Sequence, residues 1–222
     1  MDRGAPLQDP MICGVDEAGK GAVLGPMVVA AVACREDAEC RAVGARDSKE
    51  LSPLQRARLF HEITARFRYT VISYPPEEID ALRKRMTLND LLASAHAEVI
   101  SRLGPDIAYV DACDVDARRY GRRVRSLLRS SCRVVSEHSA DGKYAVVGAA
   151  SIVAKVTRDG AIAALAAEHG EIGSGYPSDP ETVAHLKAYL HTHHHPPPYA
   201  RRSWATITDL QAAREQRKLG EY

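Results

Sequence analysis

Five short stretches of the chain are rich in apolar and β-branched residues, as buried strands are. They cover residues 12–16, 26–34, 68–74, 106–112 and 132–136. The second stretch, PMVVAAVAC, is apolar at odd and even positions alike, which is typical of an interior strand with both faces covered. The pattern therefore predicts a sheet of about five strands.

Segments with the helical spacing of apolar residues separate these stretches. Ser52 and Pro53 supply an N-cap and a first-position proline for one helix. We expect Asn89 to cap a second helix and Asp116 to cap a third. Further helices are predicted at 149–169, at 180–190 and in about the last 18 residues. Because strands alternate with helices, the sequence predicts a layered α/β domain.

The composition is that of an ordinary globular chain. Its 222 residues are 45% hydrophobic and 27% charged, enough for one large domain with a core. No apolar stretch approaches the ~20 residues of a membrane span, and the N-terminus lacks a signal-peptide pattern, so we expect a cytoplasmic protein without a membrane partner. The formal net charge of +1 favours no class of partner. Five cysteines without a C-x-x-C pair predict reduced, mostly buried thiols rather than disulfides or a zinc site.

Two adjacent carboxylates, Asp16 and Glu17, stand between the first predicted strand and a glycine-rich loop. Residues 14–20 match the spacing of a phosphate-binding loop, but Gly21 stands where the serine or threonine that holds magnesium should be. Two carboxylates would also repel a triphosphate held there. The remaining alternative is an ordinary turn, in which glycines allow φ > 0 and both carboxylates are solvated.

Two further aspartates, Asp111 and Asp159, favour a metal site over a simple turn. Asp111 follows the apolar run IAYV at the carboxyl end of a strand, where sites of open α/β sheets form. Asp159 shares one helical stripe with Ser151 and Lys155, which could face the sheet edge. Four converging carboxylates need cations, because buried like charges are costly when unpaired. Oxygen ligands suit Mg²⁺ or Mn²⁺, and two such ions about 4 Å apart suit phosphodiester hydrolysis.

Seven blocks occur along the chain in the order GVDEAGKGAVLGPMVVAAV, RDSKEL, TLND, YVDACDV, YAVVGAASIVAKVTRD, GSGYPSDP and RRSWATI. Together they closely resemble type 2 ribonuclease H, particularly its archaeal form. The resemblance covers about residues 12–208. Seven ordered blocks are far more specific than any single one of them.

The resemblance implies an RNase H-like α/β fold, with a central mixed sheet flanked by helices and a helical C-terminal part. It implies a catalytic domain over 1–208 and a tail over 209–222. The implied activity is metal-dependent cleavage of RNA in RNA–DNA hybrids, and nicking 5′ of single ribonucleotides in duplex DNA to leave 3′-OH and 5′-phosphate ends. The implied setting is DNA replication and repair, and we expect a monomer. The residues that match the family's metal-binding carboxylates are Asp16, Glu17, Asp111 and Asp159.

The segment Gly19-Lys20-Gly21 aligns with the family's ribonucleotide-sensing Gly-Arg-Gly loop, so Lys20 departs from the pattern, as does Ala22 in place of the usual proline. In the family, the backbone of this loop reads a ribose 2′-OH, the group that distinguishes RNA from DNA. Lysine keeps the charge but loses the bidentate geometry of arginine. Type 3 ribonucleases H vary at the same loop and remain an alternative.

Other residues match substrate-contacting positions of the family. Tyr176 aligns with a tyrosine that stacks near the ribose junction, unless it simply packs on the following turn. Ser48 and Lys49 match further contacts, unless they only form the loop before a helix. A second rank of phosphate contacts, which could equally pair with the carboxylates, consists of Lys143, Lys155 and Arg158.

Three other charged or histidine-rich features are better explained as structure. The seven arginines between residues 118 and 133 could bind nucleic acid, but a solvated helix face is favoured. Asp114 and Asp116 are predicted to cap the helix that follows them rather than to bind metal. The tract HTHHHPPP is interpreted as a loop.

The chain ends in a Q-x-x-L-x-x-Y pattern made by Gln216, Leu219 and Tyr222. The pattern resembles the sliding-clamp-binding box of many archaeal replication proteins, in which one helical turn inserts into a hydrophobic pocket. The alternative is an ordinary amphipathic terminus. Two other functions also stay open. A junction resolvase on the same scaffold would cut all-DNA junctions, and a clamp-tethered binding protein would show no metal-dependent turnover.

Overall fold

The computed structural model describes residues 10–220, with side chains through residue 216. The described residues cluster into two compact units. The first unit comprises residues 10–16, 29–72 and 92–154, and the second comprises residues 17–28, 73–91 and 155–220. Each unit is therefore assembled from three separate segments of the chain.

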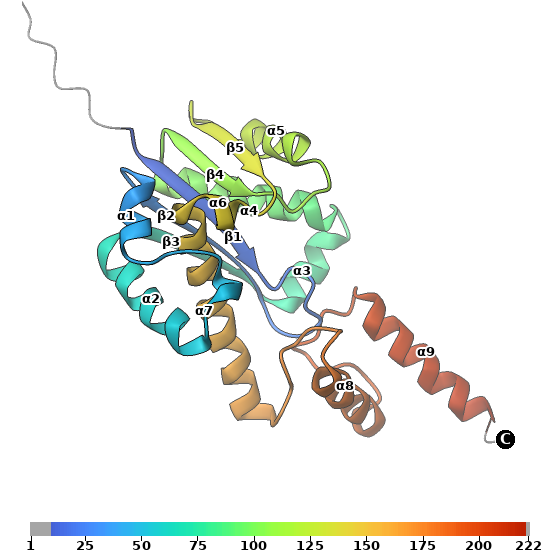
Figure 1. Ribbon diagram of the computed structural model, residues 1–222. Helices are drawn as coiled ribbons and strands as arrows, with labels where there is room; N and C mark the ends of the chain where they lie inside the picture. The colour runs from blue at the N-terminus through green and yellow to red at the C-terminus, as the bar shows by residue number, and fades with distance from the viewer. Residues whose placement is uncertain (1–9, 221–222) are drawn as a thin grey trace, which may run out of the picture. The chain divides into compact units, whose positions relative to one another are not determined.

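A five-stranded mixed sheet has the strand order β3-β2-β1-β4-β5 (Figure 1). The strands are β1 (Ile12–Ala18), β2 (Met27–Cys34), β3 (Arg68–Tyr74), β4 (Ile107–Asp111) and β5 (Arg133–Glu137). β1 is parallel to β4, and β4 is parallel to β5. All eight residues of β2 are buried, as expected of an interior strand. The prediction of an α/β fold with a five-stranded sheet is confirmed.

Helices connect the strands within and between the units. The first unit holds α1 (Asp37–Ala42), the 3-10 helix η1 (Ser48–Glu50), α2 (Pro53–Arg66), α5 (Ala117–Leu127) and α6 (Ala140–Lys143). The second unit holds α3 (Pro76–Arg83), α8 (Pro180–His193) and α9 (Ala205–Gly220). Two helices run through both units, α4 (Leu88–Leu103) and α7 (Ala145–His169). In the first unit, α5 packs on β5 and α6 on β4 (Figure 1).

Local capping explains where several helices begin. The Ser52 hydroxyl accepts a hydrogen bond from the Gln55 N–H and completes a capping box at the start of α2. Asp116 caps α5 through the Arg119 N–H at 2.9 Å, so both predictions are confirmed.

The predicted cap Asn89 is wrong, because α4 begins one residue earlier, at Leu88. The Thr87 hydroxyl accepts a hydrogen bond from the Asp90 N–H at 3.1 Å and also donates one to the Asp90 carboxylate. This reciprocal pair provides a hydrogen-bond acceptor for an N–H group of the first helical turn and makes Thr87 the better cap.

A hydrophobic core fills the second unit. It gathers Val23 and Leu24 of the loop after β1, Ile162 of α7, and Leu186 of α8, each 9% exposed or less. In the part of the chain that the structure describes, no helix is long and apolar enough to cross a bilayer. The five cysteines all lie in the described residues and form no disulfide, and four of them are buried, as predicted.

Candidate active site

Three carboxylates lie at the carboxyl ends of adjacent strands in the first unit. Val15 of β1 pairs in register with Val110 of β4, so the next residues, Asp16 and Asp111, are neighbours across the two strands. Asp111 pairs in turn with Glu137 of β5. Neighbouring strands lie about 4.8 Å apart, and residues in register on parallel strands project from the same face. The fold therefore brings these carboxylates together on one side of the sheet.

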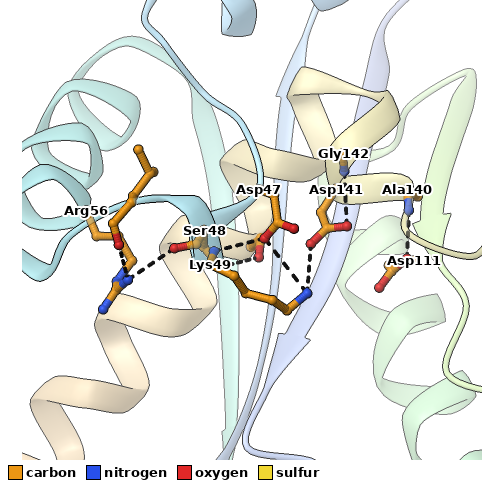
Figure 2. A network of polar contacts seen from close by, with 10 residues as sticks. Asp47, Ser48, Lys49, Arg56, Asp111, Ala140, Asp141 and Gly142 are labelled. Atoms are coloured by element: carbon orange, nitrogen blue, oxygen red, sulfur yellow. Dashed lines mark hydrogen bonds and ion pairs between the residues drawn. The ribbon is translucent and has the colours of Figure 1, made fainter.

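A fourth carboxylate, that of Asp141 in α6, joins this group, although no sequence pattern predicted it. The backbone N–H of Ala140 donates to Asp111 Oδ1 at 2.8 Å, which places the following residue beside the end of β4 (Figure 2). The side chain of Asp141 is only 2% exposed and accepts from the N–H of Gly142 at 3.0 Å. The buried carboxylate is fixed by its own backbone, so its oxygens are held in a defined position.

Lys49 links the carboxylates of Asp16 and Asp141 electrostatically. Its Nζ lies 3.2 Å from Asp141 and 3.8 Å from Asp47. Figure 2 draws both contacts. Burial alone would lower the pKa of this ammonium group. Carboxylates outweigh burial and raise that pKa, and in order of effect they belong to Asp141, Asp47 and Asp16. Lys49 therefore supplies one positive charge to a cluster of three carboxylates, so the cluster keeps a net negative charge.

This donor set fits a divalent cation. Asp16 is 6% exposed and Asp141 is 3% exposed, so neither carboxylate is freely solvated. Clustered carboxylates of low exposure repel one another, and a hard cation with oxygen ligands relieves that repulsion. In the first unit, the residues that could hold such an ion are Asp16, Asp111 and Asp141.

Ser48 contributes structure to the loop that carries Lys49. Its hydroxyl is buried and forms a hydrogen bond of 2.9 Å with the hydroxyl of Ser151. Arg56 of α2 donates to the Ser48 carbonyl at 3.1 Å (Figure 2). These contacts fix η1 and so position Lys49, whose side chain is 79% exposed.

Glu137 is engaged by other side chains. It accepts hydrogen bonds from Lys143 Nζ at 2.6 Å and from the Tyr144 hydroxyl at 2.9 Å, and these contacts lower the pKa of its carboxyl. Lys143 thus pairs with a carboxylate, which is one of the two roles expected for it.

In the second unit, Gly19, Lys20 and Gly21 form the turn after β1. Gly19 has φ = +83°, and a Cβ at this position would overlap the guanidinium of Arg158. The turn therefore needs glycine at residue 19 for both its backbone conformation and its packing. Lys20 is half-buried and Gly21 is exposed, so the tip of the turn is accessible.

Tyr176 lies in the same unit as this turn. The guanidinium of Arg158 lies 4.7 Å from the centre of the Tyr176 ring, and the ring remains partly exposed. Arg158 is 1% exposed, so it supports the ring from inside the protein. It is a packing residue rather than the surface phosphate contact that the sequence suggested.

Asp159 and Glu17 also belong to the second unit. Asp159 pairs with Lys155, one helical turn earlier on α7, at 2.6 Å. Its side chain is 41% exposed, whereas Asp16 and Asp141 are buried. Glu17 follows Asp16 in β1 and is half-buried.

The predicted clamp-binding residues lie at the end of the chain. Gln216 is exposed on α9. The side chain of Leu219, and all of Tyr222, lie outside the described residues.

Comparison with known proteins identifies close relatives of this chain. A family model described as Ribonuclease HII matches residues 13–207. The Ribonuclease HII of Methanoregula boonei is 56% identical over 212 residues, which cover 96% of this chain and 100% of that relative. Sequence similarity thus extends through both units.

Two solved structures share the fold. The ribonuclease H2 from Pyrococcus horikoshii OT3 has a TM-score of 0.86 and 38% identity, and the match covers 93% of this chain and 99% of that one. The RNase HII of a PCNA:RNase HII complex from Archaeoglobus fulgidus has a TM-score of 0.82 and 44% identity, and that match covers 87% and 95% of the two chains.

Proposed function

The chain belongs to the ribonuclease HII family, hydrolases that act on the RNA of RNA–DNA hybrids, and on this premise we propose its finer activity. The protein cleaves the RNA strand of hybrids and nicks duplex DNA on the 5′ side of a single ribonucleotide. It leaves 3′-OH and 5′-phosphate ends. The observation that carries the proposal is the cluster of Asp16, Asp111 and Asp141 at the strand ends, since a metal-dependent phosphodiesterase needs such ligands.

The proposed ligands of Mg²⁺ or Mn²⁺ are these three aspartates together with Glu17, which is retained from the sequence motif beside Asp16. Asp141 replaces Asp159 in the set, because Asp141 is buried beside Lys49 whereas Asp159 is only half-buried and paired with Lys155. The chemistry that such ions supply is activation of the attacking water and stabilisation of the leaving 3′-oxygen.

The protein groups orient the ligands before substrate binds. The N–H of Ala140 fixes Asp111, and the N–H of Gly142 fixes Asp141, so both carboxylates need little rearrangement. Lys49 reduces the repulsion among them, and its exposed ammonium group can also bind a phosphate of the cleaved strand. Ser48 anchors this lysine through Ser151 and is not itself proposed as a substrate contact.

Ribonucleotide selectivity is assigned to the turn Gly19–Gly21 and to Tyr176. The exposed tip of the turn lets the main chain approach a sugar closely enough to bind its 2′-OH. Tyr176 offers a partly exposed ring, held by Arg158, on which the sugar or base at the junction can stack. Lys20 then contacts phosphate as a point charge.

The test uses a duplex with one ribonucleotide beside an all-DNA control, each with Mg²⁺ or Mn²⁺. We expect a single nick 5′ of the ribonucleotide, no cleavage of the control, and no cleavage when the metal is chelated. Asp16→Asn should abolish nicking while the variant still binds the duplex. Cutting of all-DNA junctions, or full activity of Asp16→Asn, would contradict the proposal.

We also propose that the C-terminal tail binds a sliding clamp. Support comes from the Gln216, Leu219 and Tyr222 pattern and from the Archaeoglobus fulgidus relative, which was solved as a complex with PCNA. Binding of the full chain to purified PCNA, compared with a Leu219→Ala/Tyr222→Ala variant, tests this. Equal affinity of the two proteins would remove the tail from the interface.

A further inference from the structure

Two arginines of the second unit, Arg158 of α7 and Arg201 before α9, are buried, and their hydrogen bonds to described residues go to main-chain carbonyls rather than to carboxylates. They are 1% and 0% exposed, and their side chains are the largest fully buried ones among the described residues. Burial lowers the pKa of both guanidinium groups, and Arg158 lowers that of Arg201 further; the carboxylates of Asp159 and Asp80 offset these effects only in part. A buried pair of like charges is costly, so it needs a specific explanation.

The two guanidinium groups bind main-chain carbonyls of the loop after β1. Arg201 donates to the carbonyls of Lys20 and Gly25, both at 3.1 Å. Arg158 donates to the carbonyl of Leu24 at 3.5 Å and to that of Ser174 at 3.1 Å. The loop therefore turns carbonyl oxygens inward at three positions, toward fixed cationic donors.

Arg158 also joins this loop to the segment that carries Tyr176. It fills the space that a Cβ at Gly19 would occupy, and it lies 4.7 Å from the centre of the Tyr176 ring. Between these residues, the carbonyl of Gly175 accepts hydrogen bonds from the N–H groups of Val23 at 2.8 Å and Leu24 at 3.1 Å. The turn at Gly19 and the ring of Tyr176 thus both pack against the guanidinium of Arg158, which fixes their relative position.

Stability alone does not account for the two arginines. Nε of Arg158 and Nη2 of Arg201 are buried and make no hydrogen bond to any described residue. Such unsatisfied donors destabilise a fold, and apolar residues of similar volume in place of buried ions are often neutral or stabilising. Apolar side chains have no hydrogen-bond donors, so they cannot fix the orientation of the main-chain carbonyls as the arginines do.

We propose that Arg158 and Arg201 are positioning residues that fix the turn Gly19–Gly21 and the Tyr176 ring in the geometry that selects a ribose. This inference rests on the proposed function and deepens it. Neither arginine reaches substrate, because both are buried. They act through the main chain, by holding the loop carbonyls inward and keeping the turn and the ring at a constant separation.

The test compares Arg158→Met, Arg158→Lys and Arg201→Lys with a matched control, Arg83→Lys. Arg83 is an exposed residue that lies 4.9 Å from the centre of the same Trp204 ring that Arg201 covers at 4.8 Å. We expect kcat/KM on a duplex with one ribonucleotide to fall about 10- to 100-fold in the first three variants. On a uniform RNA–DNA hybrid the loss of kcat/KM should be much smaller. Every nucleotide of the RNA strand carries a 2′-OH, so a less ordered loop can still bind one at any position along the strand. The control should match the unmodified protein on both substrates.

Hydrogen exchange of the metal-free, substrate-free protein provides the second readout. Backbone amides at 19–25 and 174–176 should exchange faster in the three variants, while the melting temperature of Arg158→Met stays equal or rises. Equal losses on both substrates, or unchanged exchange at 19–25, would overturn the inference. If the unmodified protein fails to nick the duplex, the proposed function fails, and faster exchange would then support positioning of the loop alone. If Arg158→Met does not fold, the arginine is a stability residue and the inference is wrong.

Discussion

At the scale of single residues, burial is the basis on which we propose Asp141 rather than Asp159 as the fourth metal ligand. Asp141 lies in the first unit beside Lys49, with 2% of its side chain exposed, whereas the side chain of Asp159 is 41% exposed. We expect Asp141→Asn to lower kcat for nicking by about 100-fold or more, because loss of a metal ligand removes electrostatic stabilisation of the transition state. Asp159→Asn should change kcat by less than about threefold, since Asp159 is not among the proposed ligands and pairs with Lys155 one turn earlier on the same helix.

Single-turnover nicking rates at saturating Mn²⁺ measure this difference. The matched control is Asp47→Asn, which removes a carboxylate that lies 3.8 Å from Lys49 but was not proposed as a ligand. A large loss in Asp159→Asn with a small one in Asp141→Asn would restore the ligand set inferred from the sequence.

The position of Lys20 yields a second prediction at this scale. Its carbonyl is held by Arg201 at 3.1 Å, and its side chain is half-buried. If the main chain of the turn reads the 2′-OH, as proposed, Lys20→Arg should leave ribonucleotide selectivity intact and at most strengthen phosphate binding. The ratio of kcat/KM on single-ribonucleotide and all-DNA duplexes measures selectivity. Cleavage of all-DNA duplex by the variant would show that the side chain itself discriminates.

The sequence predicted Asp16 and Asp111 as strand-end acids, but it did not reveal Asp141. An aspartate in the polar segment SADGK has no apolar periodicity around it. Its defining contact is with Lys49, 92 positions away in sequence. A local pattern carries no information about such a pair, so the sequence favours Asp159, which stands on a clear helical stripe.

At the scale of elements, Gly14 lets β1 approach the first turn of α7 within the first unit. A Cβ at residue 14 would overlap the backbone of Val146 and Val147. Gly14→Ala must therefore displace backbone, and we expect it to lower the free energy of unfolding by about 1–3 kcal/mol or more. Urea unfolding measures the loss, with Gly142→Ala as the control, because a Cβ at residue 142 would meet nothing within 4 Å. Equal stabilities of the two variants would show that α7 can shift without cost.

The N-terminus of α8 gives a prediction about pH. Asp179 caps this helix and accepts hydrogen bonds from the N–H of Ser174 at 2.6 Å and that of Glu181 at 3.0 Å. Hydrogen bonding by Ser174, through its side chain foremost and then its N–H, and by the Glu181 N–H lowers the pKa of Asp179 to about 2, below the ~3.9 of an unfolded chain. The carboxylate therefore stabilises the fold fully above about pH 4, and this contribution is lost as the pH falls toward 2.

Asp179→Asn keeps a capping oxygen but removes the titration. The melting temperature of the unmodified protein should fall more steeply between about pH 4.5 and 2.5 than that of the variant. Parallel pH profiles of the two proteins would mean that the carboxyl has an ordinary pKa.

The bounds of strands and helices could be predicted from the sequence where neighbouring residues determine them. The five strands begin and end within two residues of their predicted bounds, because β-branched runs bounded by polar residues mark them directly. The sequence pattern predicts a helix from residue 149, whereas α7 begins at Ala145. The Val146 N–H is bound by the carboxylate of Asp37 at 2.9 Å, so a residue 109 positions away caps that turn. No periodicity near residue 145 encodes such a cap.

At the scale of the whole molecule, sequence alone placed the strands but not their order or the two compact units. The order β3-β2-β1-β4-β5 puts β1 beside β4, which are separated by about 90 residues in the chain. Each unit combines three distant segments, so contacts between segments, rather than any linker composition, define it. The sequence has no Pro- or Gly-rich linker that would mark such boundaries, and it predicted one domain through residue 208.

Metal binding should therefore appear in the stability of the folded chain as well as in its activity. The carboxylates of Asp16, Asp111 and Asp141 come together only when β1, β4 and α6 are assembled, so the ion binds the folded state and not the unfolded one. At a free Mn²⁺ concentration 100 times the dissociation constant, the gain is about 2.7 kcal/mol, or about 5–10 °C in melting temperature for a chain of this size. The double variant Asp16→Asn/Asp111→Asn should melt higher without metal, because repulsion is removed, and should not respond to Mn²⁺. Differential scanning calorimetry with and without Mn²⁺ measures both effects. An equal metal response in the variant and the unmodified chain would place the ion elsewhere.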